Sequence, residues 1–277
     1  MAYQITGQQY RDEWIHSFQR GETYLKDTVT KEMVTEGSSA AIFAIAGTSS
    51  GMTSRGANGL IPTRNATDRQ VTLTLKERHT LENQTKFNVF TSQAGKLREV
   101  MQHRSRMDAV REIDDEIILA LDTATNQWNS GTAVNPTFGV VNDIISDLWE
   151  NNAGDGVCCV WTPKTWAKIR TFDQFTSADY VDAKPLMGEA MRPVYWNNAT
   201  HFVHTGLPGM GTATAKNFAF AKAAVGHAIA NGETDVDADY NREHAYSWDR
   251  ATIYHVAAIL QQEGVIEITT NDTVALT

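Results

Sequence analysis

The sequence predicts an α+β protein, and two patterns carry this prediction. Apolar residues recur every three or four positions from about Ser92 to about Trp128, which is the period of a long helix. Shorter segments, such as Val157–Trp161 and Lys216–Lys222, have the length and the apolar content or alternation of strands. Both kinds of element mix in the middle of the chain, so we expect helices and sheets around a shared core.

The composition is that of a globular protein. With 277 residues, of which 42% are hydrophobic, the chain can bury the core of one large domain or of two connected ones. Its formal net charge of -9 argues against tight binding along nucleic acid, because that affinity comes mainly from Lys and Arg. Cys158 and Cys159 are neighbours, which excludes a disulfide framework and fits a reducing compartment. The chain starts without signal-peptide features and contains no long apolar run, so we expect a protein made in the cytoplasm without a membrane span.

The first 46 residues are expected to form an arm and two lead-in strands. Tyr10, Trp14 and Phe18 are four apart, which places them on one face of a short helix that needs an apolar surface to lie on. Val29–Val34 and Ala40–Ala46 are strand-like runs on either side of a turn. The arm is therefore predicted to contact a partner.

A long loop follows. Residues 47–69 contain four glycines, a proline and many Ser, Thr and Asn residues, but little that could form a core. Val71, Leu73 and Leu75 then alternate with polar residues, which predicts a half-buried strand, and residues 79–87 are expected to return beside it. A two-stranded projection of this kind is only marginally stable alone, so we expect another chain to support it.

The predicted helix of residues 92–128 would be a spine roughly 50 Å long. Arg104 and Asp108, and Arg111 and Asp115, are four apart and can pair along it. The first half of this helix is basic and the second half acidic, against the preference of the helix dipole. A solvated face is the common explanation for such a charge run, and neighbouring chains that neutralise these charges are the other interpretation.

The second half of the chain is expected to hold a mixed module and a closing hairpin. Helices are predicted at 140–149, 163–169 and 223–230. Strands are predicted at 157–161, 193–196, 200–204 and 216–222, with a turn at Asn197-Asn198. Residues 253–260 and 265–269 are predicted to pair as an antiparallel hairpin through Gln262-Glu263-Gly264.

One motif suggests catalysis. Gly47-Thr48-Ser49-Ser50-Gly51 matches the nucleophile elbow of serine hydrolases, and an apolar run precedes it. The elbow also needs a helix directly after the serine, and the composition there is that of a loop. A flexible loop is therefore the preferred interpretation, and a hydrolase that uses Ser49 is an alternative.

Possible metal ligands are better explained as ordinary structure. Asp235, Asp237 and Asp239 imitate the start of a calcium loop, but a tyrosine stands where the loop needs Gly, so a solvated strand edge is favoured. His201 and His204 are three apart in a predicted strand, which directs them to opposite faces, and no third ligand has zinc spacing. The cysteines are interpreted as small buried hydrophobes. We expect no metal and no cofactor.

Several segments resemble one family. Similarity to tailed-bacteriophage major capsid proteins, of the Hong Kong 97 type, is seen in Gln19–Gly21, Leu25–Val29, Gly59–Pro62, Arg111–Ile118, Pro185–Glu189, Asn217–Gly226 and Gly264–Ile268. The predicted order of arm, extended loop, spine helix, mixed module and closing strands resembles the same family over nearly the whole chain. The resemblance implies an N-terminal arm with lead-in strands at 1–46, an extended β-hairpin loop at 47–90, a peripheral domain with the spine helix at 91–135 and 247–277, and an axial domain at 136–246.

The resemblance also implies a function. It is that of a shell subunit, not an enzyme, which assembles with itself through pentamers and hexamers into an icosahedral virion capsid around double-stranded DNA. Assembly would take place in the host cytoplasm, with a scaffolding protein, a portal and a decoration protein as further partners, non-specific contact with the DNA and no membrane. Candidate interface residues are Tyr10, Trp14, Phe18, Arg55, Arg64, Arg69, Lys76, Arg78, Lys86, Arg104, Arg111 and Asp115. An encapsulin-like shell around a protein cargo shares this fold and is a second alternative.

Overall fold

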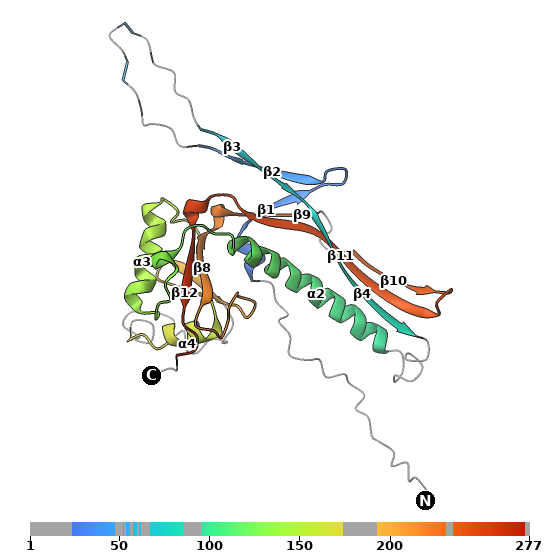
Figure 1. Cartoon of the computed structure of the whole chain (residues 1–277). Helices are drawn as coiled ribbons and strands as arrows, with labels where there is room; N and C mark the ends of the chain where they lie inside the picture. The colour runs from blue at the N-terminus through green and yellow to red at the C-terminus, as the bar shows by residue number, and fades with distance from the viewer. Residues whose placement is uncertain are drawn as a thin grey trace, which may run out of the picture. The chain divides into compact units, whose positions relative to one another are not determined.

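The fold combines helices with β-sheets, as the sequence predicts (Figure 1). A computed structural model describes residues 24–47, 52, 54–55, 58–59, 61, 67–85, 96–173, 193–230 and 235–274. The predicted helix of the N-terminal arm lies outside the described residues. No helix among those described is long and apolar enough to cross a membrane.

The elements of the described residues have the following bounds. The strands are β1 (Thr30–Val34), β2 (Ala40–Ile45), β3 (Arg69–Thr74), β4 (Lys76–Thr85), β5 (Val157–Trp161), β6 (Val194–Trp196), β7 (Ala199–Val203), β8 (Ala215–Ala221), β9 (Val225–Ala230), β10 (Asp235–Asn241), β11 (Tyr246–Ile259) and β12 (Val265–Thr270). The helices are α2 (Lys96–Leu121), α3 (Phe138–Glu150) and α4 (Pro163–Ile169), with 3-10 turns η1 (Leu25–Asp27), η3 (Trp128–Gly131), η5 (Lys222–Ala224) and η6 (Gln262–Gly264).

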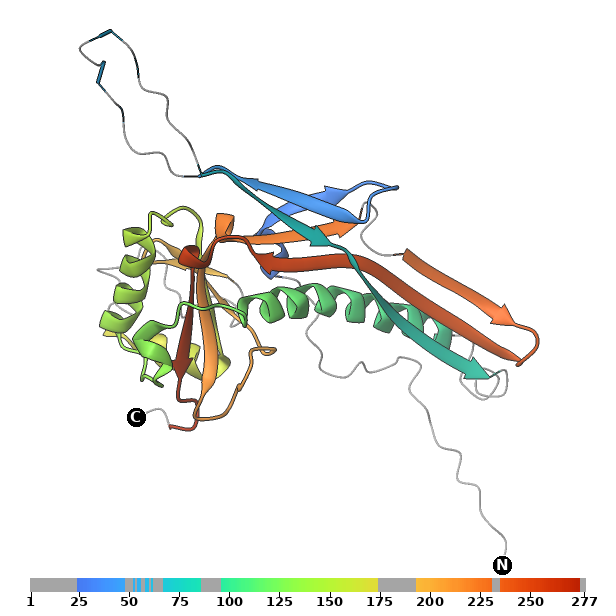
Figure 2. The same cartoon turned by 45° about the horizontal axis from the view of Figure 1, so that its top comes forward.

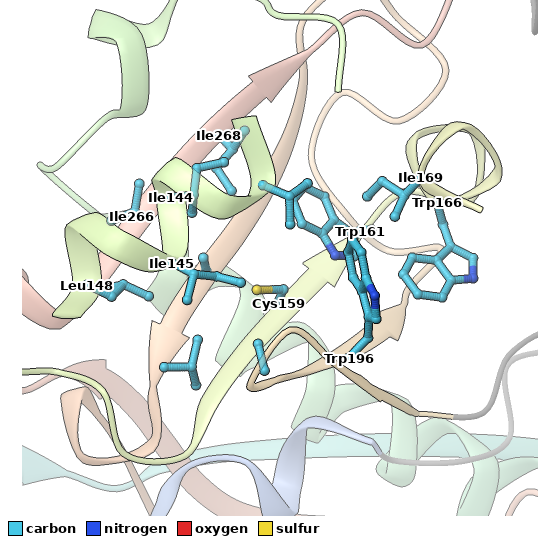
Figure 3. Close-up of a cluster of buried hydrophobic side chains, with 14 of the residues drawn as sticks. Ile144, Ile145, Leu148, Cys159, Trp161, Trp166, Ile169, Trp196, Ile266 and Ile268 are labelled. Carbon is cyan, nitrogen blue, oxygen red and sulfur yellow. The ribbon is translucent and has the colours of Figure 1, made fainter. Parts of the chain in front are cut away.

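One sheet, in the order β12-β8-β5-β7-β6, forms the centre of the mixed module. Every residue of β5 is buried, as the apolar run predicted. The helices α3 and α4 contribute to the same core, and Figure 3 shows Cys159 between the α3 residues Ile144, Ile145 and Leu148 and the tryptophans of this core. The helix α3 begins here because Thr137 caps it, its side chain accepting a hydrogen bond from Val140 N.

The hairpin of β6 and β7 confirms a local prediction. Asn197 and Asn198 connect the two strands with φ angles of 50° and 58°. Two consecutive positive φ angles are the geometry of a type I′ turn, whose twist suits an antiparallel hairpin, and Asn tolerates them better than most residues.

A second sheet has the order β1-β9-β11-β10, and β4 pairs with β11 (Figure 2). The strand β9 corrects the sequence analysis, which predicted a helix at 223–230. The alanines of this segment suit a helix, but all residues from Val225 to Ile229 are buried between β1 and β11. Burial on both faces of a sheet removes the alternation that identifies a strand.

The pairing of β3 was also predicted wrongly. This strand pairs antiparallel with β2, while β4 pairs with β11. Leu75 alone separates β3 from β4, and one residue without a turn signal cannot reverse the chain. Ala41, Phe43 and Leu73 are buried against Ala228 and Val256, which fixes the register of β2 with β3.

The predicted closing hairpin does not form. The strand β11 pairs with β9 and β10, whereas β12 pairs with β8 in the other sheet. The short connection through η6 therefore carries the chain from one sheet to the next. Sequence proximity suggested a hairpin, but β11 and β12 each pair with strands that are distant from the connection.

The spine helix exists and ends earlier than predicted, at Leu121. With 26 residues α2 is about 39 Å long. Its buried stripe includes Ala109, Ile113, Ile117 and Leu121, at a spacing of four. The apolar period continues past Leu121, but Glu267 N donates to Asn126 O at 2.9 Å, so the continuation runs beside β12 instead of extending the helix.

Candidate assembly interface

The ribbon of β2 and β3 has two different faces. One face packs on β9 and β11. The other face is made of uncharged residues, of which Ile42, Ala44, Gln70, Thr72 and Thr74 are exposed and Ala40 is half-buried. Ile42 has 59% of its surface exposed. Further along the same loop Met52 is 101% and Ile61 72% exposed. Charge-free exposed surface of this kind is typical of a surface that another chain covers.

The sequence analysis did not find this face. All six residues of β2 are apolar, so the alternation that would separate the inner Phe43 from the outer Ile42 is missing. The register with β3 shows the difference, since Ile42 lies opposite Thr72 and Phe43 opposite Val71.

The predicted interface residues are only partly described. Tyr10, Trp14, Phe18, Arg64 and Lys86 lie outside the described residues. All the others are in the described ranges, and most have contacts within the chain, so a role between subunits remains a prediction for all of them.

The two described arginines of residues 47–69, Arg55 and Arg69, each donate to a backbone oxygen. Arg55 Nε donates to Gly59 O at 2.8 Å, and Arg69 Nη2 donates to Leu260 O at 2.6 Å. The second bond ties the start of β3 to the end of β11.

Ion pairs connect β4 with α2. Lys76 Nζ is 2.6 Å from Glu116 Oε1 and Arg78 Nε is 3.1 Å from Glu112 Oε1. Arg104 Nη1 is 3.2 Å from Glu82 Oε1. The basic residues at the start of β4 thus pair with the acidic second half of α2. Glu82, near the end of β4, pairs with the basic first half of α2. The side chains of β4 therefore neutralise part of the α2 charge for which we considered neighbouring chains.

The predicted pair of Arg104 with Asp108 is wrong. Asp108 accepts a hydrogen bond from Arg111, three residues later, while Arg104 binds Glu82. Asp115 is exposed. The strand β4 competes for Arg104 because its side chains project onto the helix, which spacing along the helix cannot reveal.

We expect the bond between Glu82 and Arg104 to contribute about 1 kcal/mol to the free energy of unfolding, since its atoms are partly exposed. The single change Glu82→Arg should lower stability by about that amount or slightly more, because it puts two cations together. The double change Glu82→Arg with Arg104→Glu should regain most of it. Denaturant titration of all four proteins measures the coupling, and additive effects of the two changes would show that the pair contributes nothing.

The histidines considered as metal ligands are core residues. Trp161 Nε1 donates to His201 Nδ1 at 2.9 Å, and His201 Nε2 donates to Trp196 O at 3.0 Å. His204 contacts Asp114 instead, at 3.3 Å, and accepts a hydrogen bond from Gly206 N. Within the described part of the chain no group of His, Cys, Asp and Glu could hold a metal ion. The strand thus directs the two imidazoles to different surroundings, as predicted.

The cysteines are buried thiols. Both are free and buried, and burial raises the pKa of Cys158 to about 12 and raises that of Cys159 as well. A thiol reacts as thiolate, so neither has the character of a nucleophile. Ser49 lies outside the described residues, while Gly47 N donates to Asp68 Oδ1 at 2.9 Å.

A buried polar network near the end of the chain was not predicted. Asp272 is fully buried, and its Oδ1 accepts from the hydroxyls of Thr162 and Thr165, both at 3.0 Å. Its Oδ2 accepts from Gly211 N at 3.1 Å. The carboxylate thereby joins the cap of α4, the loop before β8 and the segment after β12. An isolated Asp in a polar stretch gives no sequence signal for such a role.

Comparison with known proteins agrees with this architecture. A family model described as phage capsid protein matches residues 2–144 and 145–272. No curated protein matches the chain. The capsid of Ralstonia phage GP4 is similar in structure, with a TM-score of 0.73 and 10% identity over 100% of this chain and 98% of that chain.

Two further solved structures show the same likeness. A chain of Mycobacterium phage Che8 has a TM-score of 0.72 and 15% identity, with 99% of this chain and 100% of that chain covered. The capsid of a native GTA particle has a TM-score of 0.72 and 13% identity, with 95% of each chain covered. At these identities the structural likeness shows the fold alone. The assignment of the chain to a family rests on the family match. The chain therefore belongs to the phage capsid protein family, as a major capsid protein with the α+β fold of phage shells.

Proposed function

We propose that the chain assembles with copies of itself, through pentamers and hexamers, into an icosahedral shell around double-stranded DNA, without catalysing a reaction. The observation that carries this proposal is the exposed, uncharged face of the β2–β3 ribbon, which an isolated subunit leaves in water. The family match supports the same conclusion. We propose the N-arm, loop, peripheral and axial boundaries given above, with the correction that β4 belongs with the spine helix and not with the loop.

Further partners follow from the same role. A scaffolding protein, a portal and a decoration protein are proposed to bind the shell during assembly in the host cytoplasm. The packaged DNA is proposed to be enclosed without sequence-specific contact, since the formal net charge of -9 provides little for phosphate binding.

The test of this function is direct. The purified chain is imaged by negative-stain electron microscopy and measured by light scattering, alone and with the product of a neighbouring scaffold gene. Closed shells or capsomer rings are the expected result. A monodisperse monomer under every condition would contradict it and would make esterase activity, compared between the natural chain and Ser49→Ala, the next measurement.

The outer face of the ribbon gives a sharper prediction. Ile42→Asp places a charge where we expect a neighbouring chain, so shells should be lost while the subunit stays folded. Ile42→Val keeps the surface apolar and should assemble normally. The measurements are shell yield by microscopy and the melting temperature of the unassembled subunit. Shells formed by Ile42→Asp at the natural yield would show that this face is not covered.

A further inference from the structure

Asn58 precedes Gly59 in the loop between β2 and β3. Both residues are exposed, and Gly59 has a φ of 74°. A Cβ atom placed on Gly59 would have Arg55 Nε as its neighbour, at 3.9 Å. The peptide nitrogen that follows Asn58 is therefore not crowded by side chains of the described residues.

The amide of Asn58 is also not held in place. Within the part of the chain that the structure describes, its side chain makes no hydrogen bond or ring contact. An exposed amide without such bonds can turn so that its Cγ faces the nitrogen of the next residue. Most asparagines are protected because the following residue has a Cβ that obstructs this approach, and glycine has none.

We propose that Asn58 is a site of spontaneous deamidation. The Gly59 nitrogen loses its proton to solvent and attacks Asn58 Cγ. The new N–Cγ bond replaces the bond from Cγ to Nδ2, and ammonia leaves after taking up a proton. Water then opens the resulting cyclic imide at either carbonyl, which gives aspartate or isoaspartate at position 58. Water is the sole co-reactant, so atoms and charges balance.

The neighbouring cation favours this product. Arg55 Nε donates to Gly59 O at 2.8 Å, so a guanidinium lies beside the residue that supplies the attacking nitrogen. A nearby positive charge stabilises both the nitrogen anion that attacks and the carboxylate that results. The loop gains one negative charge next to an arginine that we predict to contact a neighbouring subunit. This last consequence rests on the proposed function, and the reaction itself does not.

The chain contains its own control. Asn198 is also exposed and in a turn, with a φ of 58°, but the next residue is the buried Ala199 of β7. The nitrogen that would attack Asn198 is the backbone nitrogen of Ala199, which carries a Cβ beside it and begins a paired strand. The other Asn-Gly pair of the sequence, at 231–232, lies outside the described residues and is followed as a separate peptide.

The test is peptide mass spectrometry on the whole chain, aged in mildly alkaline buffer. Position 58 should acquire the mass shift of an amide replaced by a carboxyl group at least about tenfold faster than Asn198. Gly59→Ala should slow the conversion to the rate of Asn198, and Asn58→Gln should remove it. Equal rates at the two asparagines, or an unchanged rate in Gly59→Ala, would overturn the proposal. The rates are measured on unassembled protein, so a failure of shell formation would leave this result unaffected.

Discussion

Acidification of the unassembled subunit should reduce its free energy of unfolding by about 6 kcal/mol between neutral pH and pH 4, through His201 and His227. Burial lowers the pKa of each from 6.5 to about 4, and for His227 the neighbouring His255 lowers it further. The folded chain therefore keeps both imidazoles neutral at a pH where the unfolded chain has protonated them. The stabilisation that the two neutral imidazoles provide is fully present above pH 6.5. It is lost as the pH falls toward 4, below which the loss levels off, and each histidine accounts for about 3 kcal/mol.

The two histidines resist protonation for structural reasons. His201 Nδ1 already accepts the Trp161 N–H, so a proton there would break that bond. His227 Nε2 lies 3.4 Å from His255 Nδ1, with Lys26 and Lys31 as further positive charges and Glu116 as the opposing one. A loss of about 6 kcal/mol is comparable to the whole stability of a typical domain, so we expect acid to unfold the subunit.

Denaturant titration across this pH range measures the effect. His227→Leu keeps an apolar group of similar size and removes one titration, so the dependence on pH should fall by about half. Ile229→Val, on the same strand, should lower stability equally at every pH. An unchanged pH dependence in His227→Leu would show that His227 is not the residue responsible.

Loss of the Asp272 carboxylate should cost about 4 kcal/mol, because Asp272→Ala leaves the hydroxyls of Thr162 and Thr165 and the N–H of Gly211 without their buried acceptor. A chain of hydrogen bonds also ends at the Asp272 carboxylate, with each donor directed toward it. Asn217 Nδ2 donates to Thr270 Oγ1 at 2.8 Å, which leaves the Thr270 hydroxyl to donate to Thr165 and the Thr165 hydroxyl to donate to Asp272. Removing the final acceptor therefore disturbs the entire chain of bonds.

Two variants separate this network from local effects. Asp272→Asn keeps the shape but turns one acceptor into a donor, so it should be nearly as destabilising as Asp272→Ala. Thr273→Ala removes an exposed hydroxyl one residue away and should cost less than about 1 kcal/mol. Thermal unfolding of the three proteins provides the comparison. If Asp272→Ala were as mild as Thr273→Ala, the carboxylate would not hold the end of the chain.

Local sequence patterns predicted the elements whose own residues supply the cap, the apolar stripe or the turn that they need. The helix α3 has its capping threonine and an apolar stripe, and the β6–β7 hairpin has two asparagines at its turn. The sequence also placed β5 correctly, since a short apolar run between turn signals has few alternatives. The resemblance to capsid proteins, based on the order of elements, was confirmed by the family match.

Apart from the β6–β7 hairpin, the sequence did not reveal which strands pair. We expected β3 to pair with the strand after it and β11 with β12, yet β3 pairs with β2 across the long loop, and β11 and β12 belong to different sheets. The segment of β9 has helical composition and is a strand because β1 and β11 surround it. Spacing along α2 suggested Asp108 for Arg104, and a strand distant in sequence supplied Glu82 instead.

By itself the sequence determined the positions of α2, α3, α4 and β5, the absence of a disulfide framework, and the family of the chain, because periodicity, turn residues and the order of elements can be read along the chain. Tertiary structure decided which strands pair, which face of the β2–β3 ribbon stays exposed, and that Asp272, His201 and His227 are buried. These depend on the free energy of burying surface between segments far apart in the chain, which no local pattern contains.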